Sequence, residues 1–539
     1  GYIYVVIVSF ILAESLDKMR DLSGKELGIM TAITGLYGLV NAFSDKLFVP
    51  SIYGAFGLLA ATLIMLFLLN SDKITFSKKQ FRGIVLGMTA LVIFLNAKWF
   101  ITSGDDSYTH LDTYVSAGDS KKKISGTALK HLDEVPGADT DEFYRSTNLV
   151  TTGNLRSSSL LYGYNDVSTF SSTLNGGIVN YNNAMGNCRW NIVSIYDYNF
   201  RTYLNTLASV KYMGVAKKNT ATIPYGYKKV QETKNKYYSI YENQYSLPLG
   251  YTYDKIVNAD RIDQYSAAEK QETTMLAAIV EDKDMDKNSN LTVATKLPLT
   301  AQKLKIKNIK LNGVSMTKDT IEIEKPGATM KFSFEAPANA ETYLSLVGDI
   351  YAEKDAKEHF ITARIKAPGV KYGHKFRIDA YTTGQKEYLF NLGYREGAVK
   401  TCTLKFVGTG TLKYKDLAIY SQTMSNYADR VNALKENSLQ NAKAEKNAVT
   451  GNITVDKDKM LVVTLPYQKG WTAYVDGKKT DIQRVNYQYI GINLKKGTHD
   501  IKLHYQLPGI KLAFMITGCG IIAFVAIIIF NIVRKRRKN

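Results

Sequence analysis

The chain has 539 residues, and its hydrophobic share of 45% and charged share of 22% are close to those of globular proteins. Lys and Arg exceed Asp and Glu by 69 to 49, a formal net charge of +20, which favours anionic partners such as lipid headgroups or phosphate-bearing wall polymers. A solvated Lys-rich surface without a specific partner explains the same excess. Nucleic acid is the least favoured anionic partner because the basic residues are spread out, and we predict no nucleic-acid binding.

The first 101 residues are predicted to form transmembrane helices. Residues 51–70 and 82–101 contain charge-free apolar runs of the kind that cross a bilayer, and the basic residues between them mark the cytoplasmic side. Residues 1–14 are apolar and are interpreted as part of a span. The apolar stretch 27–43 is short for a full crossing, and both a tilted span and an interfacial helix fit it. Because the chain opens at Gly1 inside an apolar run, we expect it to be the C-terminal part of a longer membrane protein.

Residues 102–508 are predicted to form a large β-rich domain outside the membrane. We expect a mixed α/β part over 102–250, with a strand at Lys211–Val215. Residues 251–425 consist of short alternating runs broken by turn residues, such as TMKFSFEAP, which is typical of an antiparallel β-sandwich or jelly roll. The remaining part, 426–508, is predicted to contain a polar helical linker and a small antiparallel β domain.

The small β domain carries the clearest strand patterns. The linker is expected over Asn426–Ala444, and the strands are the runs LVVTLP, WTAYV, RVNYQYIGINL and HDIKLHY. Asp476 and Gly477 follow WTAYV, and Asp-Gly is a strong hairpin signal because both turn residues need positive φ angles. Trp471 is expected to fill the core of this sheet.

Residues 510–533 form the clearest span, an apolar run followed at once by the basic tail 534–539. Positive residues beside a span mark its cytoplasmic end, so the chain is expected to end inside the cell with the large domain outside. The predicted fold class is an α+β membrane protein in which transmembrane helices at both ends flank a β-rich extracytoplasmic domain.

The residue types that usually hold metals or nucleotides are sparse. Cys519 lies in the last span, so at most one disulfide, between Cys188 and Cys402, is expected. The six histidines lack the paired spacing of a zinc site, and there is no CxxC, GxSxG elbow, phosphate-binding Gly-rich loop or nucleotide fingerprint. These absences argue against a soluble nucleotide-using enzyme.

Motifs near the C-terminus resemble a known family. Pro466 is followed by Lys469-Gly470-Trp471, a turn over Val475–Lys478, a strand start at Gly497–His499 and Pro508-Gly509 before the last span. Two earlier segments, LASVKYMGV and YENQYSLPLGY, match as well. In this combination the motifs resemble the YfhO family of bacterial membrane proteins over most of the chain from about residue 150 onward.

The resemblance implies a polytopic glycosyltransferase of the GT-C type. Such enzymes transfer a sugar from a polyprenyl-phosphate carrier to a surface polymer, such as lipoteichoic acid, outside the cell. Their catalytic acid lies in the first external loop of the N-terminal half, and this chain is expected to start after that loop. No catalytic residue is therefore carried over. No cofactor is evident, and the resemblance leaves a divalent cation open for the full-length enzyme.

Asp105 and Asp106 are the first candidate binding residues. They follow a predicted span on its external side, where a lipid-linked phosphosugar and a divalent cation would lie, and paired carboxylates suit hard cations. A solvated loop leading into the external domain is the favoured alternative explanation.

Asn165, Asp166 and Trp190 are further candidates, within the Asn- and Tyr-rich stretch 162–190. Aromatic faces stack on sugar rings, and amides and carboxylates bind sugar hydroxyls. A loop-rich fold that packs its own aromatic side chains is the favoured alternative for this stretch.

The sequence as a whole predicts a multi-pass protein of a bacterial cell membrane. Its expected partners are membrane lipids, a polyprenyl-phosphate-linked sugar and an anionic surface polymer. The second hypothesis is a non-catalytic, membrane-anchored module that binds carbohydrate or a partner protein. Transport is poorly supported because the clear spans carry no charged residue.

Overall fold

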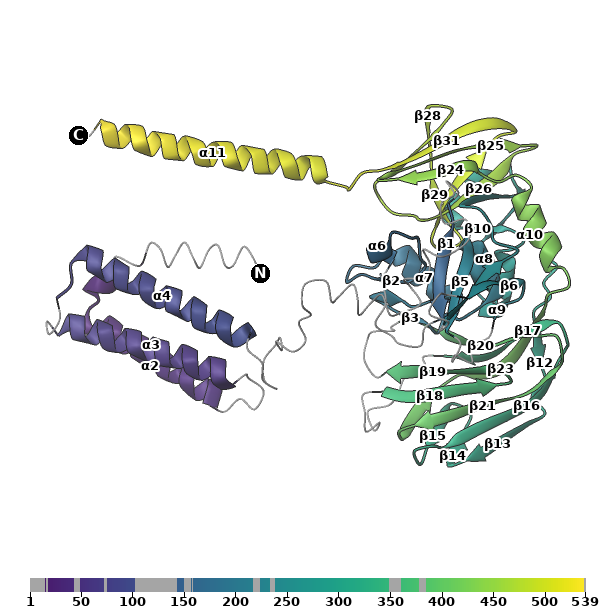
Figure 1. The fold of residues 1–539 in the computed structure, drawn as a ribbon, viewed down its shortest axis with the longest axis horizontal. Coiled ribbons are helices and arrows are strands. Elements are labelled where there is room, and N and C mark those ends of the chain that lie inside the picture. The colour runs from purple at the N-terminus through teal and green to yellow at the C-terminus, as the bar shows by residue number, and fades with distance from the viewer. Residues whose placement is uncertain are drawn as a thin grey trace. The chain divides into compact units, whose positions relative to one another are not determined.

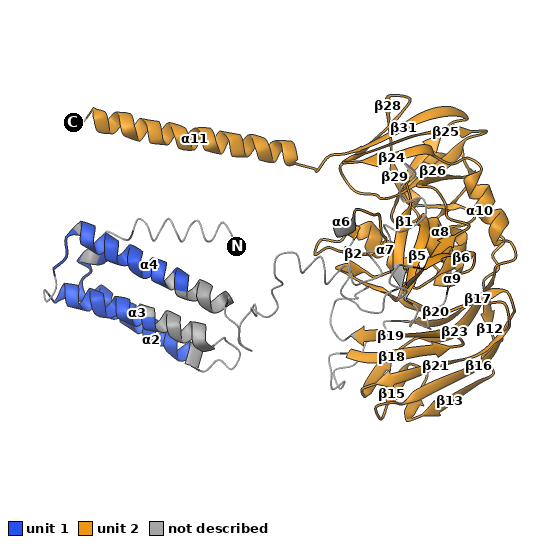
Figure 2. Cartoon of the chain, in the orientation of Figure 1, with its two compact units in different colours: residues 1–123 blue, residues 124–539 orange. Residues whose placement is uncertain are grey.

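The structure of the chain is a computed structural model, and residue contacts divide it into two units, 1–123 and 124–539 (Figure 2). Helices make up the first unit and β-sheets most of the second (Figure 1). The structure describes residues 15, 18–42, 49–71, 75–101, 143–149, 157, 159–216, 223–232, 238–348, 360–377 and 384–537.

The described residues of the first unit form three long helices and a short 3₁₀ turn. Ser23 and Glu26 form a reciprocal capping box before the first long helix, with the Ser23 amide donating to the Glu26 carboxylate at 2.8 Å. Ser77 and Gln80 do the same before the last one. The elements are η1 (Lys18–Asp21), α2 (Gly24–Ala42), α3 (Val49–Asn70) and α4 (Lys78–Ile101). The helices share a small core of Leu27, Leu63, Leu66 and Phe81.

Helices therefore occupy the regions in which spans are predicted, 27–43, 51–70 and 82–101, whereas residues 1–14 lie outside the described part. In the described residues, α11 (Ile510–Arg536) is the one helix that is both long and apolar enough to cross a membrane. None of its residues is buried by the protein. The crossing of a membrane by α3 and α4 stays a prediction.

The second unit contains a β-sandwich built of two main sheets. Alternation is clear in β16, where Met330, Phe332 and Phe334 are buried and Lys331 is exposed. Sheet D has the order β12-β23-β17-β20, with strands Gln302–Leu304, Asp416–Thr423, Ala340–Val347 and Glu387–Arg395. Sheet E has the order β13-β16-β21-β18-β19, with strands Asn308–Asn312, Thr329–Ala336, Val399–Val407, Phe360–Ala367 and Val370–Arg377.

A three-stranded sheet, F, adds to the same apolar core. Its order is β14-β15-β22, with strands Val314–Met316, Thr320–Ile323 and Gly410–Lys413. The core between the sheets includes Phe390 from sheet D and Leu404 and Phe406 from sheet E. Figure 1 shows these strands together at one end of the second unit. The β-sandwich fold class is thus present.

Sheet C combines strands that precede the sandwich in the sequence with strands that follow it. Its order is β11-β9-β10-β29-β30-β26-β8. Met460, Leu461, Val462 and Val463 in β26 are all fully buried because both faces of this sheet are covered. The strands are β8 (Gly250–Tyr253), β9 (Lys255–Asn258), β10 (Ala278–Val280), β11 (Thr292–Val293), β26 (Lys459–Pro466), β29 (Gln483–Val485) and β30 (Tyr489–Leu494).

Helices cover one face of sheet C and sheet G covers the other. Sheet G has the order β24-β25-β31-β27-β28, with strands Gln440–Glu445, Ala448–Val455, Gly497–Tyr505, Trp471–Val475 and Lys478–Thr480. The helices that the structure describes in the second unit before α11 are α6 (Ser159–Tyr162), α7 (Gly176–Ala184), α8 (Thr202–Leu207), η4 (Asp260–Ile262), α9 (Ala267–Thr273), η5 (Asp282–Asp284), η6 (Asp286–Asn288) and α10 (Tyr427–Lys435).

Two small sheets come from the first part of the second unit. Sheet A has the order β1-β5-β7-β6, with strands Arg145–Leu149, Val210–Ala216, Tyr238–Asn243 and Tyr227–Glu232. Sheet B has the order β2-β4-β3, with strands Thr169–Phe170, Ser194–Ile195 and Trp190–Asn191. The strand predicted at Lys211–Val215 is therefore β5.

The sheets divide the chain differently from the predicted boundaries 102–250, 251–425 and 426–508. Residues 251–293, expected in the sandwich, pair instead with strands of 459–494 in sheet C. The helix of the linker ends at Lys435, because the next buried apolar side chain, Leu439, packs into the core between sheets C and G. Residues 440–445 then form β24 rather than helix.

The C-terminal hairpin is present as the sequence predicts, and one expected strand is broken. Asp476 and Gly477 have φ angles of 53° and 76°, and Val475 pairs with Lys478 across the turn. The run RVNYQYIGINL forms two strands, because Asn486 and Tyr487 both have positive φ angles and turn the chain between β29 and β30. Trp471 is partly buried and packs against the core between sheets C and G, as expected.

Cys188 and Cys402 lie in the same apolar core but are free thiols. Burial raises the pKa of both, to about 12 for Cys402. The disulfide that the sequence left open is not formed between them.

Candidate functional site

The candidate residues predicted from the sequence do not converge on one site. Asp105 and Asp106 lie outside the described residues. Asn165 is exposed, and its amide donates to the carbonyl of Tyr144 at 3.2 Å. Asp166 is half-buried next to it, and its carboxylate accepts from the Ser168 hydroxyl at 2.6 Å and from two backbone amides. Sugar binding by this pair stays a prediction.

Burial is the main reason that the pKa of Asp166 is raised to about 6. The three hydrogen bonds from Ser168 and from the amide of Val167 oppose that rise. The carboxylate thus holds its own turn together. The backbone of Asp166 forms a parallel β-bridge with Ser146 of β1.

Trp190 lies in the interior, 3% exposed, and its indole N–H donates to the Gln385 side chain at 3.1 Å. Its ring faces cannot stack on a sugar in this arrangement. Asn187 in the same stretch is fully buried, and its amide donates to Asn182 at 2.7 Å and to the carbonyl of Asp197 at 3.0 Å. These residues of the stretch 162–190 pack within the protein, as the favoured alternative states.

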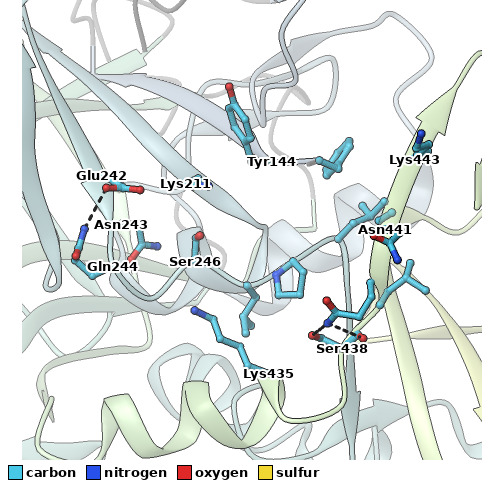
Figure 3. Close-up of a pocket in the computed structure, with 17 residues that line it drawn as sticks. Tyr144, Lys211, Glu242, Asn243, Gln244, Ser246, Lys435, Ser438, Asn441 and Lys443 are labelled. Carbon is cyan, nitrogen blue, oxygen red and sulfur yellow. Dashed lines mark hydrogen bonds between the residues drawn. The ribbon is translucent and has the colours of Figure 1, made fainter. Parts of the chain in front are cut away.

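A groove in the second unit offers a different candidate site. It has a volume of about 920 Å³ and lies where sheet A, the loop before β8, the end of α10 and β24 come together. Figure 3 shows Glu242 and Gln244 on one side of it and Asn441 and Lys443 on the other. The lining residues are Phe143, Tyr144, Lys211, Glu242, Asn243, Gln244, Ser246, Leu247, Pro248, Leu249, Lys435, Ser438, Leu439, Gln440, Asn441, Ala442 and Lys443.

An aromatic and basic cluster forms one wall of the groove. Tyr144 lies just before β1, and its ring meets that of Tyr212 edge-on, with centroids 5.2 Å apart. The Lys211 ammonium lies 5.6 Å from the Tyr144 ring and 5.7 Å from the Tyr212 ring. The parallel pairing of β1 with β5 places Tyr144 beside these residues although they are more than 60 positions apart. Such a cluster presents both a π-face and a cation.

Hydrogen bonds hold the polar floor of the groove in place. The buried Asn243 amide donates to the Thr206 hydroxyl at 2.9 Å and to the carbonyl of Val210 at 3.1 Å. The Gln440 amide donates to the Ser438 hydroxyl at 2.9 Å. The Gln244 amide donates to the Glu242 carboxylate at 3.4 Å. The backbone that carries these amides is therefore fixed before any ligand arrives.

Hydrogen bonds of Arg145 stabilise the groove wall that contains Phe143 and Tyr144. Its guanidinium donates to the Thr464 hydroxyl at 3.0 Å, to the Thr464 carbonyl at 2.7 Å and to the Ala208 carbonyl at 2.9 Å. Burial lowers the pKa of this group from its ordinary value. These bonds tie β1 to β26 of sheet C and fix the start of β1, where Phe143 and Tyr144 enter the groove.

Charge and chemistry point to an anionic, hydroxyl-bearing ligand. The lining includes three lysines, Lys211, Lys435 and Lys443, and one acid, Glu242. Amides and hydroxyls between them can both donate and accept hydrogen bonds. In the described part of the chain, no group of three or more His, Cys, Asp or Glu residues is arranged to hold a metal ion. The groove therefore suits binding by charge, stacking and hydrogen bonds.

Sequence reasoning missed the groove because its walls come from segments near 143, 211, 242–249 and 435–443. Only tertiary structure brings them together. One local signal was available, since YENQYSLPLGY supplies the loop from Glu242 to Leu249 on the groove wall.

The chain is distantly similar to several solved structures. The C-terminal CBM6 of LamC, a marine laminarinase from Zobellia galactanivorans, matches with 9% identity and a TM-score of 0.17, over 23% of this chain and 100% of that one. The mycobacterial arabinofuranosyltransferase AftD, as its R1389S mutant, matches with 8% identity and a TM-score of 0.23, over 93% of this chain and 64% of that one.

Comparison at the level of sequence is more direct. A protein of Bacillus subtilis (strain 168) described as "Uncharacterized protein YfhO" is 25% identical over 565 aligned positions, which cover 99% of this chain and 60% of the relative. The chain thus spans about three fifths of the length of that relative. The family described as "Bacterial membrane protein YfhO" matches residues 1–517. The chain therefore belongs to the YfhO family of bacterial membrane proteins.

Proposed function

We propose that this chain is the C-terminal part of a membrane glycosyltransferase and that its groove binds the acceptor. The acceptor is an anionic polymer of the cell surface, such as lipoteichoic acid, and the sugar comes from a polyprenyl-phosphate carrier. The observation that carries the proposal is the composition of the groove, in which three lysines and the Tyr144 ring surround fixed amides. The phosphates of such a polymer need cations, and its polyol units need hydrogen-bonding groups.

The arrangement of the chain in the membrane is part of the proposal. Helix α11 ends in Arg534, Lys535 and Arg536, and positive residues beside a span favour the cytoplasmic side. With α3 and α4 as further spans, both ends of the second unit connect to the membrane and the groove lies outside the cell. An external polymer then meets the groove without crossing the bilayer.

The chemistry of transfer is assigned to residues upstream of this chain. The chain covers 60% of its Bacillus subtilis relative, and the rest of that relative has room for further spans and an external loop. We propose that the catalytic acid, and a divalent cation if the enzyme uses one, belong to that part. Asp105 and Asp106 remain proposed contributors on the external side of α4.

The test compares groove variants in two assays. Lys211→Gln with Lys435→Gln removes two groove cations, and Lys296→Gln with Lys318→Gln removes two exposed lysines elsewhere in the second unit as a control. Binding of poly(glycerol phosphate) to the detergent-solubilised chain is measured by calorimetry. In cells that carry the longer gene, the sugar content of lipoteichoic acid is measured by NMR.

We expect the groove variant to lower both polymer affinity and sugar content at least tenfold, and the control variant to change neither. Loss of affinity with unchanged sugar content would support the second candidate function, a membrane-anchored binding module without catalysis. That alternative is favoured by the groove itself, whose contacts can bind a polymer without a catalytic group. Unchanged affinity together with unchanged sugar content in the groove variant would refute the acceptor site.

A further inference from the structure

The outward face of sheet E carries an unusual concentration of positive charge. Among the side chains that the structure describes, strand register places seven exposed basic residues on this face. The five strands contain a single acidic residue, Glu335, which is bonded to Lys307 at 2.5 Å. We call the seven residues the basic face: Lys310, Lys331, Arg364, Lys366, Lys371, Lys375 and Lys405.

The basic face is organised in rows that run across the strands. One row reads Lys310, Lys331, Thr403, Lys366 and Lys371, each paired with the next on the neighbouring strand. Neighbouring strands lie about 4.8 Å apart, so this row crosses roughly 19 Å of sheet. Four cations and one hydroxyl therefore lie along an approximately straight line.

A second row lies two residues along each strand. It reads Asn312, Thr329, Lys405, Arg364 and Gly373. The two rows are roughly 7 Å apart, since a strand rises about 3.4 Å per residue. Lys375 belongs to the next row, where its ammonium lies 3.9 Å above the Phe360 ring.

This pattern is unfavourable for the isolated sheet. Lys310 faces Lys331, Lys366 faces Lys371 and Arg364 faces Lys405 directly across strand pairs. Like charges in directly opposed positions destabilise a sheet. None of the seven forms an ion pair with any residue of the described ranges. A folding role therefore does not explain the face.

Protection of sheet edges explains only part of the pattern. Lysines on edge strands prevent edge-to-edge pairing, and β13 and β19 are the edges of sheet E. Lys331, Lys405, Arg364 and Lys366 lie on the three inner strands, which have no open edge. Their charges have to serve another purpose.

From this arrangement we propose that the basic face of sheet E binds a linear, phosphate-bearing polymer along its rows of cations. Thr403, Thr329 and Asn312 lie within the rows and supply donors and acceptors for hydroxyls between the phosphates. No Trp or Tyr projects from the described part of this face, and Phe360 is covered by Lys375. Membrane-surface sites usually insert large apolar side chains, so a hydrophilic polymer fits better than a lipid surface.

This binding surface is separate from the groove and does not depend on sugar transfer. None of the seven residues lines the groove, whose walls come from sheet A, α10 and β24. A surface of point charges without stacking rings holds a polyanion along its length rather than at one unit. The basic face would thus retain a polymer near the protein, whether or not the groove acts on it.

The test uses the full chain in detergent and synthetic poly(glycerol phosphate) as the probe. Lys331→Gln, Lys366→Gln and Lys405→Gln together remove three inner-strand charges, and Lys478→Gln, Lys479→Gln and Lys502→Gln remove three exposed charges from sheet G as the control. Affinity is measured over a range of salt concentrations. Unfolding temperatures report whether each variant is folded.

We expect the sheet E variant to bind at least tenfold more weakly at low salt. The slope of log affinity against log salt should fall by about 2, since each phosphate contact contributes roughly 0.7 in single-stranded polyanions. The sheet G variant should bind as the parent does. The unfolding temperature of the sheet E variant should rise, because opposed like charges are removed.

Three outcomes would overturn the inference. Equal loss in both variants would mean that overall charge, and not the basic face, binds the polymer. Unchanged affinity in the sheet E variant would leave the groove as the sole polymer site. Unchanged polymer binding with weaker attachment to phosphatidylglycerol vesicles would assign the face to a lipid surface. Loss in the Lys211→Gln, Lys435→Gln variant concerns the groove alone and tests the proposed function separately.

Discussion

The β-sandwich and the junction beneath it are held together by different chemistry. The sandwich core consists almost entirely of apolar side chains, such as Phe332, Phe390 and Phe406. At the junction, where α8, α9 and α10 meet sheet D, fully or nearly buried charges and amides form a network. Apolar side chains pack with many partners, whereas each buried polar group needs one particular partner. The apolar pattern of the sequence therefore determines the sandwich core, whereas individual polar contacts determine the junction.

The network at the junction links segments far apart in the sequence. The fully buried Glu272 of α9 accepts from Arg430 of α10 and from the backbone amides of Thr300 and Ala301, at 2.7 and 2.8 Å. The Gln271 amide next to it donates to the Tyr343 hydroxyl at 2.8 Å. These contacts fix how the sandwich is attached to the helices.

Removal of one charge from the buried pair should give the largest effect. Arg430→Met leaves the Glu272 carboxylate buried without its cation, and such a change typically lowers the free energy of unfolding by about 3 to 5 kcal/mol. Urea unfolding measures the loss. The double variant Glu272→Gln, Arg430→Met should lose less than the sum of the two single variants. If the losses simply add, the junction is not a network of the kind described.

The pH dependence of the free energy of unfolding should also distinguish the junction, which contains a buried carboxyl group, from the apolar sandwich core. Burial raises the pKa of Glu341 to about 7, while Thr202 and Asn391 donate to its carboxylate. Because the folded protein holds the proton more tightly than the unfolded chain, this group favours folding at low pH. Its contribution falls as the pH rises from about 4.5 to about 7, by on the order of 3 kcal/mol.

The measurement is the free energy of unfolding at pH 5 and at pH 8. Glu341→Gln should flatten the difference between the two values, although burial also raises the pKa of Asp166 and Glu387 and some dependence should remain. If the free energy of unfolding of the Glu341→Gln variant changes between pH 5 and pH 8 as much as that of the parent protein, Glu341 is not the group that titrates.

Smaller and additive losses are expected in the sandwich core. Ile361 and Ile365 are fully buried on β18, and Ile→Val typically lowers the free energy of unfolding by about 0.5 to 1.5 kcal/mol. Four residues apart on one strand, they lie beyond direct contact, so the double variant should equal the sum within about 0.5 kcal/mol. If the losses of the two variants do not add, the sandwich core is coupled as the junction is, and the two regions do not differ in this respect.

The smallest effect is expected at the surface of the same strand. Lys366 faces Lys371, and Lys366→Gln removes this opposed pair of like charges. The free energy of unfolding should rise by about 0.2 to 1 kcal/mol at low salt, and the gain should shrink as salt is added. A loss of stability would mean that Lys366 makes a favourable contact in the fold.

The same contrast explains what the sequence could predict. TMKFSFEAP alternates because one face of β16 meets an apolar core, and Asp476-Gly477 turns because of its own backbone preferences. Both depend on local information. The hairpin, the alternating sandwich strands and the apolar run of α11 were therefore predictable.

Other features depend on distant partners and were missed. The Asn486 side chain accepts from the Ile279 amide at 2.8 Å, which helps to hold the turn that splits RVNYQYIGINL. The buried Trp190 donates its N–H to Gln385, which is 195 positions away in the sequence. The groove joins four separate segments. No local pattern identifies such partners, so the sugar-binding hypothesis fell on a stretch that largely packs inside the protein.

The strand order of sheet C has a consequence for how the protein is made. Strands β8 to β11 precede the sandwich in the chain, and their partners β26, β29 and β30 follow it. The first and last strands of the sandwich, β12 and β23, lie side by side, so the sandwich can close as a unit while later residues are still being synthesised. Residues 250–293 must wait for 459–494 before their sheet is complete. Until the C-terminal segment has been synthesised, these early strands need shielding from other chains.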